Sequence, residues 1–214
     1  MGERWGTGRV EAFSDGVFAI AITLLVLDIN VPSSSFDDLW KAIAHEWPSY
    51  LGYVTSFLTI GGIWLGHHGM FRRMRYANSA VMRVNLLLLM SVSFLPFPTR
   101  LVGDAVRNTG AERAAVIFYG ASLLVCALLL AAIWGVVARD RSLLRPEVTD
   151  DEVNEVLRSA SPSIGLYVAL TLLAIPAPRF AAFGYLLIGV FAVLSARGDS
   201  GGREPEAPGS VAPG

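Results

Sequence analysis

The side chains that could carry out acid–base chemistry lie near one end of the first apolar segments. Asp15 begins an apolar run that has no other charge before Asp28. A carboxylate inside a membrane-spanning helix costs at least about 2.5 kcal/mol unless it is paired or hydrated. The polar partners expected at the same level are Arg9, His67, His68 and Asn85. We expect these side chains to form a hydrogen-bonded cluster that ties the first three spans together.

The same side chains offer a second chemistry, because Asp15 and His67 are residue types that pass protons in transporters. A proton-coupled secondary transporter is therefore an alternative, although it favours broken helices and repeat symmetry, which the sequence does not show. An enzyme is not expected. His45 is predicted on the opposite side of the membrane from the other histidines, and no His-Glu-x-x-His occurs. Cys126 is the single cysteine and lies in an apolar run, so we predict no metal site and no cofactor.

The first apolar segment has two faces. At about 100° per residue, its large apolar side chains form a narrow stripe that consists of Phe13, Val17, Ile20, Leu24, Leu27 and Val31. Asp15 lies roughly 140° from Ile20 around the helix. We therefore assign Asp15 to the packing interface, whereas the stripe faces lipid, the protein interior or a symmetry axis. The spacing alone does not choose among these three.

The composition requires a membrane around these segments. The 214 residues are 53% hydrophobic and 16% charged, with a mean hydropathy of +0.51, which is too apolar for a water-soluble domain of this length. We predict an all-α polytopic membrane protein with a six-span unit over residues 1–196, and no nucleic-acid surface. A spanning helix needs about 20 residues, and the expected transmembrane helices are 12–31, 49–68, 84–101, 114–138, 164–175 and 180–196. Residues 197–214 are predicted to be a disordered tail.

The connections indicate an orientation. Four arginines follow the second span without an acid among them, namely Arg72, Arg73, Arg75 and Arg83. The positive-inside rule then predicts that both termini are cytoplasmic. Residues 36–47 fit a short interfacial helix outside the membrane, and Pro96 is expected to kink or end the third span. The charged segment 139–158 is expected to be soluble, with a capping box at Thr149 that opens a short helix.

Three motifs resemble the endosomal and lysosomal potassium channel family called transmembrane protein 175, in its bacterial branch. The first is Arg9-x-x-x-Phe13-Ser14-Asp15, followed by Gly-Val-Phe-Ala-Ile-Ala-Ile-Thr-Leu-Leu-Val-Leu. The second runs from Trp47-Pro-Ser-Tyr50 to Trp64-x-x-His67-His68, and the third from Asn85 to Ser93-Phe-Leu-Pro96-Phe-Pro98. The resemblance covers about residues 9 to 100.

This resemblance implies a homotetramer whose pore is lined by the first helix. The family's hydrophobic constriction falls on Ile20, Leu24 and Leu27, and the hydroxyl that favours potassium falls on Thr23. In the family the arginine, the aspartate and the histidines of the second helix hold the inner half together, and these fall on Arg9, Asp15, His67 and His68. We predict an inner polar network that packs the helices together and that also includes Phe13, Ser14 and Asn85. No Thr-Val-Gly-Tyr-Gly filter occurs, so a ring of backbone carbonyls is not expected.

We therefore predict a potassium-preferring cation channel in a bacterial inner or plasma membrane, with potassium ions, membrane lipid and other copies of the chain as its partners. Asp28 is expected to raise the cation concentration near the outer mouth of the pore. The proton-coupled transporter remains the alternative.

Overall fold

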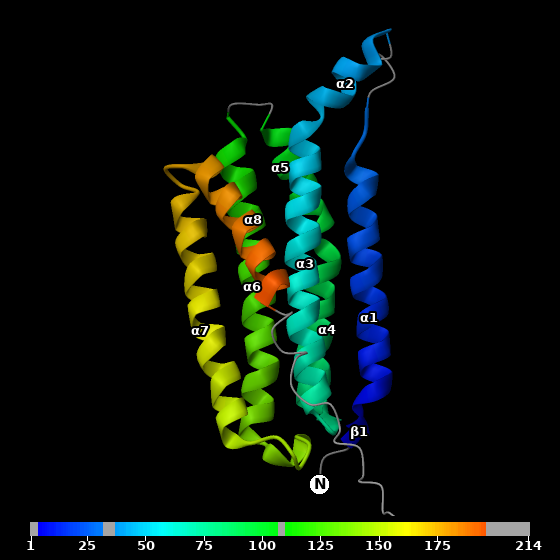
Figure 1. The fold of residues 1–214 in the computed structure, drawn as a ribbon, viewed down its shortest axis with the longest axis vertical. Helices are drawn as coiled ribbons and strands as arrows, with labels where there is room; N and C mark the ends of the chain where they lie inside the picture. The colour runs from blue at the N-terminus through cyan, green and yellow to red at the C-terminus, as the bar shows by residue number, and fades with distance from the viewer. Residues whose placement is uncertain (1–3, 32–36, 107–109, 196–214) are drawn as a thin grey trace, which may run out of the picture.

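The computed structural model describes residues 4–31, 37–106 and 110–195, and most of them lie in helices. The long helices run side by side as a bundle, with α1 at one edge and α7 at the other (Figure 1). The helices are α1 (Thr7–Leu24), α2 (Leu39–His45), α3 (Trp47–Arg73), α4 (Ser79–Phe94), α5 (Pro96–Ala105), α6 (Glu112–Arg139), α7 (Asp150–Leu173) and α8 (Pro178–Ser195). Two 3-10 turns, η1 (Leu25–Asp28) and η3 (Arg141–Leu143), follow α1 and α6. The expected all-α class is confirmed.

Five of the described helical segments are long and apolar enough to cross a membrane. They are Thr7–Asp28, Ser79–Ala105, Glu112–Arg139, Asp150–Leu173 and Pro178–Ser195. α3 is not among them, but its 27 residues extend about 40 Å at 1.5 Å per residue, which is also enough. α3 packs against α8, α5 and α1, so it lies within the bundle. The number of six spans stays a prediction.

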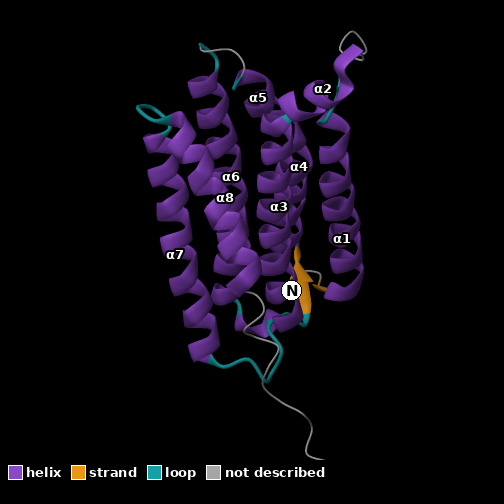
Figure 2. Ribbon diagram, turned by 45° about the horizontal axis from the view of Figure 1, so that its top comes forward, coloured by secondary structure: helices purple, strands orange, loops and turns teal. Residues whose placement is uncertain are grey.

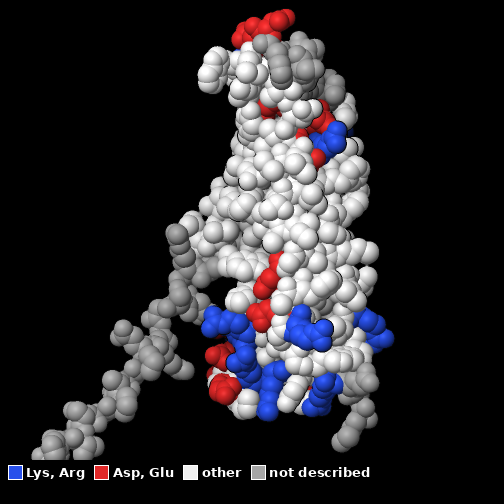
Figure 3. Space-filling view, turned by 90° about the vertical axis from the view of Figure 1, so that its right-hand side faces the viewer, with Lys and Arg blue, Asp and Glu red and all other residues white. Residues whose placement is uncertain are grey.

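A two-stranded sheet lies at the end of the bundle where α1 begins. β1 (Arg4–Gly6) pairs antiparallel with β2 (Tyr76–Asn78), as the orange strands of Figure 2 show. A bridge between Met74 and Leu144 brings the connection after α6 to the same end. Lys and Arg gather at this end in Figure 3, whereas the middle of the molecule is nearly free of them. The positive-inside rule makes this the cytoplasmic end, and that orientation stays a prediction.

The third expected span is divided at a proline. α4 ends at Phe94, and α5 begins at Pro96 in the first turn, where the missing N–H of proline would have no helical partner in any case. The side chain of Asn78 caps the other end of α4 by accepting hydrogen bonds from the N–H groups of Ala80 and Val81. The break follows the sequence expectation for Pro96.

α7 begins earlier than the expected span 164–175. It runs without a break from Asp150 to Leu173, with Pro162 inside it. The second half of the segment 139–158 therefore forms the first turns of α7, and the short helix expected after Thr149 continues into the span. The three acids of the first turn favour a helix start there, since they lie at the positive end of the helix dipole. α3 also extends beyond residue 68 to Arg73. The expected disordered tail, 197–214, lies outside the described residues.

Thr149→Ala is expected to loosen the start of α7. The N–H of Glu152 donates to Thr149 Oγ1 at 3.3 Å, and the N–H of Thr149 donates to Glu152 Oε2 at 3.1 Å, which forms the capping box that the sequence predicts. Loss of a threonine cap costs about 1 kcal/mol, so amide hydrogen exchange at 150–153 should become about fivefold faster. Glu155→Ala, on an exposed part of the same helix, is the control. Unchanged exchange in Thr149→Ala would contradict the capping role.

Candidate functional site

α1 has one buried face and one exposed face. Val10, Ser14, Phe18, Ala21 and Leu25 are buried, and their spacing of three and four residues places them on one side of the helix. The opposite side carries the aliphatic stripe of Ile20, Leu24 and Leu27, whose exposed fractions are 61%, 41% and 72%. α1 packs against α3 and α4. The exposed stripe therefore lies on the outer side of a helix at the edge of the bundle.

A buried polar network joins the three helices. Asn85 Nδ2 on α4 donates to Ser14 Oγ on α1 at 3.1 Å, and Ser14 Oγ donates to the Val10 carbonyl at 2.8 Å. His67 Nε2 on α3 lies 2.9 Å from Asn85 Oδ1. An amide oxygen only accepts, so His67 Nε2 carries the proton. The structure thus brings Ser14, His67 and Asn85 together, with exposed fractions of at most 2%.

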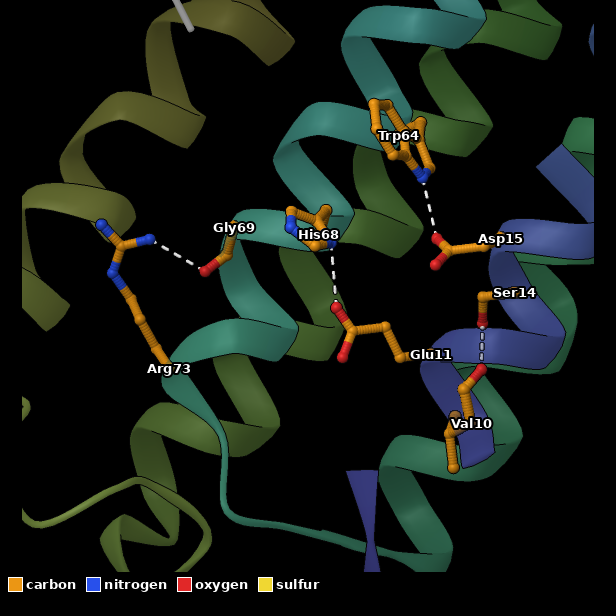
Figure 4. A network of polar contacts seen from close by, with 8 residues as sticks. All are labelled: Val10, Glu11, Ser14, Asp15, Trp64, His68, Gly69 and Arg73. Carbon is orange, nitrogen blue, oxygen red and sulfur yellow. Dashed lines mark hydrogen bonds and ion pairs between the residues drawn. The ribbon is translucent and has the colours of Figure 1, made fainter. Parts of the chain in front are cut away.

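Two further pairs connect α1 to α3 beside this network. Trp64 Nε1 donates to Asp15 Oδ1 at 2.8 Å, and His68 Nδ1 lies 2.9 Å from Glu11 Oε1 (Figure 4). The rings of Trp64 and His68 are stacked, with their centroids 5.7 Å apart. The carboxylate that the sequence identifies is therefore satisfied by an indole rather than by an arginine.

The spacing of these pairs follows from helix geometry. Glu11 and Asp15 are four residues apart on α1, and Trp64 and His68 are four apart on α3. Residues four apart lie on one face of a helix, and α1 and α3 run in opposite directions (Figure 1). The first acid therefore meets the later residue of α3. From the sequence, Trp64 was named only within the second motif and neither Trp64 nor Glu11 was given a role, although this matched spacing was a signal for both.

Arg9 and Phe13 lie outside the network of the single chain. Arg9 is exposed and makes no ion pair with any residue that the structure describes. Phe13 is 58% exposed and continues the aliphatic stripe toward the basic end. Neither side chain therefore packs the inner half of α1 against α3 or α4 within one copy.

The other end of α1 carries the remaining candidate residues. Thr23 is exposed, and its Oγ1 donates to the Ile20 carbonyl at 2.9 Å. Asp28 closes η1 at the end opposite the arginine-rich connections, where it is in the electrostatic field of Arg100 and Asp104 on α5. α1 thus has a hydroxyl beside the aliphatic stripe and a carboxylate at the stripe's outer end.

Trp64→Phe is expected to weaken the contact between α1 and α3. The substitution keeps an aromatic ring but removes the only donor that the described structure gives to Asp15. Loss of a hydrogen bond to a charged group costs about 1–2 kcal/mol inside a membrane protein, so the free energy of unfolding should fall by that amount. Chemical unfolding of the purified protein measures it. Trp40→Phe is the control because Trp40 is 84% exposed, and equal effects of the two substitutions would contradict the role of Trp64.

These features define an all-α polytopic membrane protein. No group of three or more metal-binding side chains occurs among the described residues. What the site offers instead is a fixed polar interface on one face of α1 and an apolar exposed stripe on the other. The polar interface can hold such a helix rigidly in the bundle while the exposed stripe contacts lipid, another copy of the chain or an ion.

The chain is similar to known membrane channels. The family model described as "Endosomal/lysosomal potassium channel TMEM175" matches residues 9–96. A potassium channel of Streptomyces collinus is 40% identical over 185 residues, which are 85% of this chain and 90% of the relative. A potassium channel of Chamaesiphon minutus is 39% identical over 169 residues, which are 78% of this chain and 83% of the relative. The crystal structure of a lysosomal potassium-selective channel TMEM175 homolog from Chamaesiphon minutus superposes with a TM-score of 0.80 at 34% identity, covering 89% of this chain and 97% of that one.

The chain belongs to the TMEM175 family. The resemblance drawn from the N-terminal motifs is confirmed, and so is the prediction of a polytopic membrane protein. Because the family consists of ion channels, the chain is not an enzyme. Its bacterial relatives identify it as an integral protein of the bacterial plasma membrane.

Proposed function

We propose that four copies of this chain form a potassium-preferring cation channel whose pore is lined by α1. The observation that carries the proposal is the exposed stripe of Ile20, Leu24 and Leu27, on a helix whose opposite face is fixed by buried contacts. Four copies around an axis would form rings of these side chains. Narrow aliphatic rings exclude water and block ions, so the channel opens when the rings widen.

Contact with lipid would account for the exposure of the stripe equally well. The relatives favour a stripe that faces the symmetry axis of a tetramer. Those relatives are named potassium channels and match nearly the whole described chain. The axis also gives a role to Arg9 and Phe13, which are exposed in one copy. In a tetramer these two side chains would contact the neighbouring copy, and the inner polar network would then extend across subunits.

The preference for potassium is assigned to Thr23. Its proton is given to the Ile20 carbonyl, so the lone pairs of its oxygen remain available to a cation. One such oxygen from each copy, between the rings of Ile20 and Leu24, would replace part of the hydration shell of a passing ion. Asp28, at the outer end of the same helix, would raise the local cation concentration.

Ion flux from liposomes tests the proposal. The purified chain, reconstituted at known density, should release potassium faster than sodium without a coupled substrate, and native mass spectrometry should find four chains per particle. Saturable flux that stops in the absence of a proton gradient would contradict the channel and support a proton-coupled transporter. A stable monomer with full activity would contradict the shared pore.

Thr23→Ala is expected to reduce the potassium-to-sodium permeability ratio. Loss of one oxygen ligand per copy should reduce the free-energy difference between potassium and sodium passage by about 1 kcal/mol, which corresponds to about fivefold in the permeability ratio. Ser122→Ala is a control, because Ser122 is partly exposed and also donates to a carbonyl of its own helix, that of Phe118 at 2.8 Å. Reversal potentials measured under bi-ionic conditions give the ratio. An unchanged ratio in Thr23→Ala would remove Thr23 from the selectivity assignment.

A further inference from the structure

A cavity of about 280 Å³ lies between α3, α5, α6 and α8, at the end of the bundle away from the strands. Its walls are mostly apolar and include Leu51, Val102 and Phe183. A cavity of about 150 Å³ holds benzene, so this one holds an apolar body nearly twice as large. Sites for small molecules have this composition, in which apolar walls surround a few fixed polar groups.

Three buried hydroxyls form the polar side of the cavity, which we call the hydroxyl layer. It consists of Ser56 on α3, Thr99 on α5 and Tyr119 on α6, with exposed fractions of 1%, 5% and 5%. Ser56 Oγ lies 2.7 Å from Thr99 Oγ1 and 3.0 Å from the Tyr119 hydroxyl oxygen. The layer therefore joins three helices at one point of the cavity wall.

The direction of these hydrogen bonds follows from counting protons. Each hydroxyl has a single proton, and Thr99 gives its proton to the Leu95 carbonyl at 2.8 Å. Ser56 must then donate to Thr99, and Tyr119 must donate to Ser56. The nearby Thr55 gives its proton to its own helix as well. The buried hydroxyls of the cavity thus offer lone pairs to an occupant and no proton.

The rim of the cavity adds a further acceptor. Glu112 on α6 is mostly buried, with 13% of its side chain exposed, and its Oε1 accepts from Arg179 Nε at 3.1 Å. The Arg179 side chain is 70% exposed and also lies at the rim. An occupant that enters past this pair meets a donor and an acceptor at the rim, and acceptors alone in the hydroxyl layer.

We propose that this cavity is a binding site for a small amphiphile, with an apolar body about the size of naphthalene and a hydrogen-bond donor that reaches the hydroxyl layer. The apolar body is recognised by the walls. The donor is recognised because the lone pairs of the layer are otherwise unmatched in the occupied cavity. A molecule that carries only an acceptor would place its oxygen against these lone pairs and lose the hydrogen bond.

Occupancy of the cavity also acts on α5. This helix forms one wall of the cavity and packs on its other side against η1 and α1. An occupant would hold α5 in place and thereby bias the outer half of α1. This effect on ion flux rests on the proposed channel function, whereas the binding does not.

Two probes of nearly equal shape test the binding. 2-Naphthol carries a donor, and 2-methoxynaphthalene carries only the acceptor. The full chain in lipid nanodiscs, with empty nanodiscs subtracted, should bind one 2-naphthol per chain in a fluorescence titration. The affinity for 2-methoxynaphthalene should be about tenfold lower, which is the size expected for one buried hydrogen bond. Equal affinities would overturn the assigned donor, and absence of saturable 2-naphthol binding would overturn the site.

Substitutions that fill the cavity locate the binding. Ala182→Phe and Val106→Phe enlarge side chains on two different walls, and each should abolish saturable binding of 2-naphthol. Leu187→Phe is the control on α8, because Leu187 is 68% exposed and does not line the cavity. Unchanged binding in either folded cavity variant would overturn the site. In liposomes, 2-naphthol should change ion flux through the wild type but not through Ala182→Phe, and binding without any change in flux would overturn only the link to α1.

Discussion

Leu24→Ala is expected to raise potassium flux from liposomes about tenfold or more. In the proposed tetramer the substitution replaces four isobutyl side chains by methyl groups at one level of the pore, so the rings narrow the pore less and water enters more easily. Each 1.4 kcal/mol taken from the barrier to ion passage is about tenfold in rate. Leu24 is 41% exposed in the single chain, so its truncation creates no buried cavity within the subunit. The flux should therefore rise without a matching loss of folded protein.

A control on another exposed helix separates a pore effect from general leakiness. Leu172 on α7 is 59% exposed and is also an aliphatic side chain at membrane level. Leu172→Ala should leave the flux unchanged. An equal rise in both variants would indicate a perturbed bilayer, and an unchanged flux in Leu24→Ala would count heavily against a pore lined by α1.

The two faces of α1 could be separated from sequence because helix geometry is regular. Asp15 and Ile20 fall on different sides at about 100° per residue, and in the structure Asp15 contacts Trp64 while Ile20 is 61% exposed. What the exposed face meets could not be derived in this way. Exposure to lipid and exposure to a second copy select the same aliphatic side chains.

The partners of the polar residues were harder to predict than the residues themselves. Charge complementarity suggests Arg9 as a partner for Asp15, but Arg9 lies six residues earlier on the same helix, about 1.7 turns away, and points to another side. The indole of Trp64 comes from a different helix and reaches Asp15 because α1 and α3 are antiparallel. Such a pairing depends on the relative height of two helices, which the sequence does not state.

The largest difference between the expected and the observed helix boundaries is at the start of α7, and it has a different cause. The capping box at Thr149 predicted a helix start there, but the charges before residue 159 suggested a short helix separate from the span. In the structure α7 runs without a break from Asp150 to Leu173. The strands β1 and β2 are three residues each and were not expected. A strand this short forms only when another strand pairs with it, and here the paired residues are 70 to 74 positions apart in the sequence.

Asn85→Leu is expected to destabilise the protein more than any other substitution in the polar network. Asn85 is 2% exposed and contacts both Ser14 and His67. Hydrogen bonds between membrane helices contribute about 0.6 kcal/mol on average and at most about 1.7, whereas a buried donor left unpaired costs about 1–3 kcal/mol. His67 Nδ1 has no hydrogen-bond partner among the described residues, so the substitution would leave both ring nitrogens unpaired. We therefore expect the free energy of unfolding to fall by about 2–3 kcal/mol.

A double substitution tests whether the cost comes from the unpaired histidine. The His67 ring packs against Phe18 and Phe71, with centroids 5.4 Å and 4.3 Å away, so a phenyl ring at this position keeps the aromatic contacts. His67→Phe combined with Asn85→Leu removes both partners of one hydrogen bond, which is far less costly than removing one. Unfolding in detergent, followed by tryptophan fluorescence, should show the double variant to be more stable than Asn85→Leu alone. Ser91→Ala, at a partly exposed position of α4 outside the network, should match the wild type. If the double variant is less stable than Asn85→Leu, the loss comes from packing volume, and the network does not fix α1 against α3 and α4 by its hydrogen bonds.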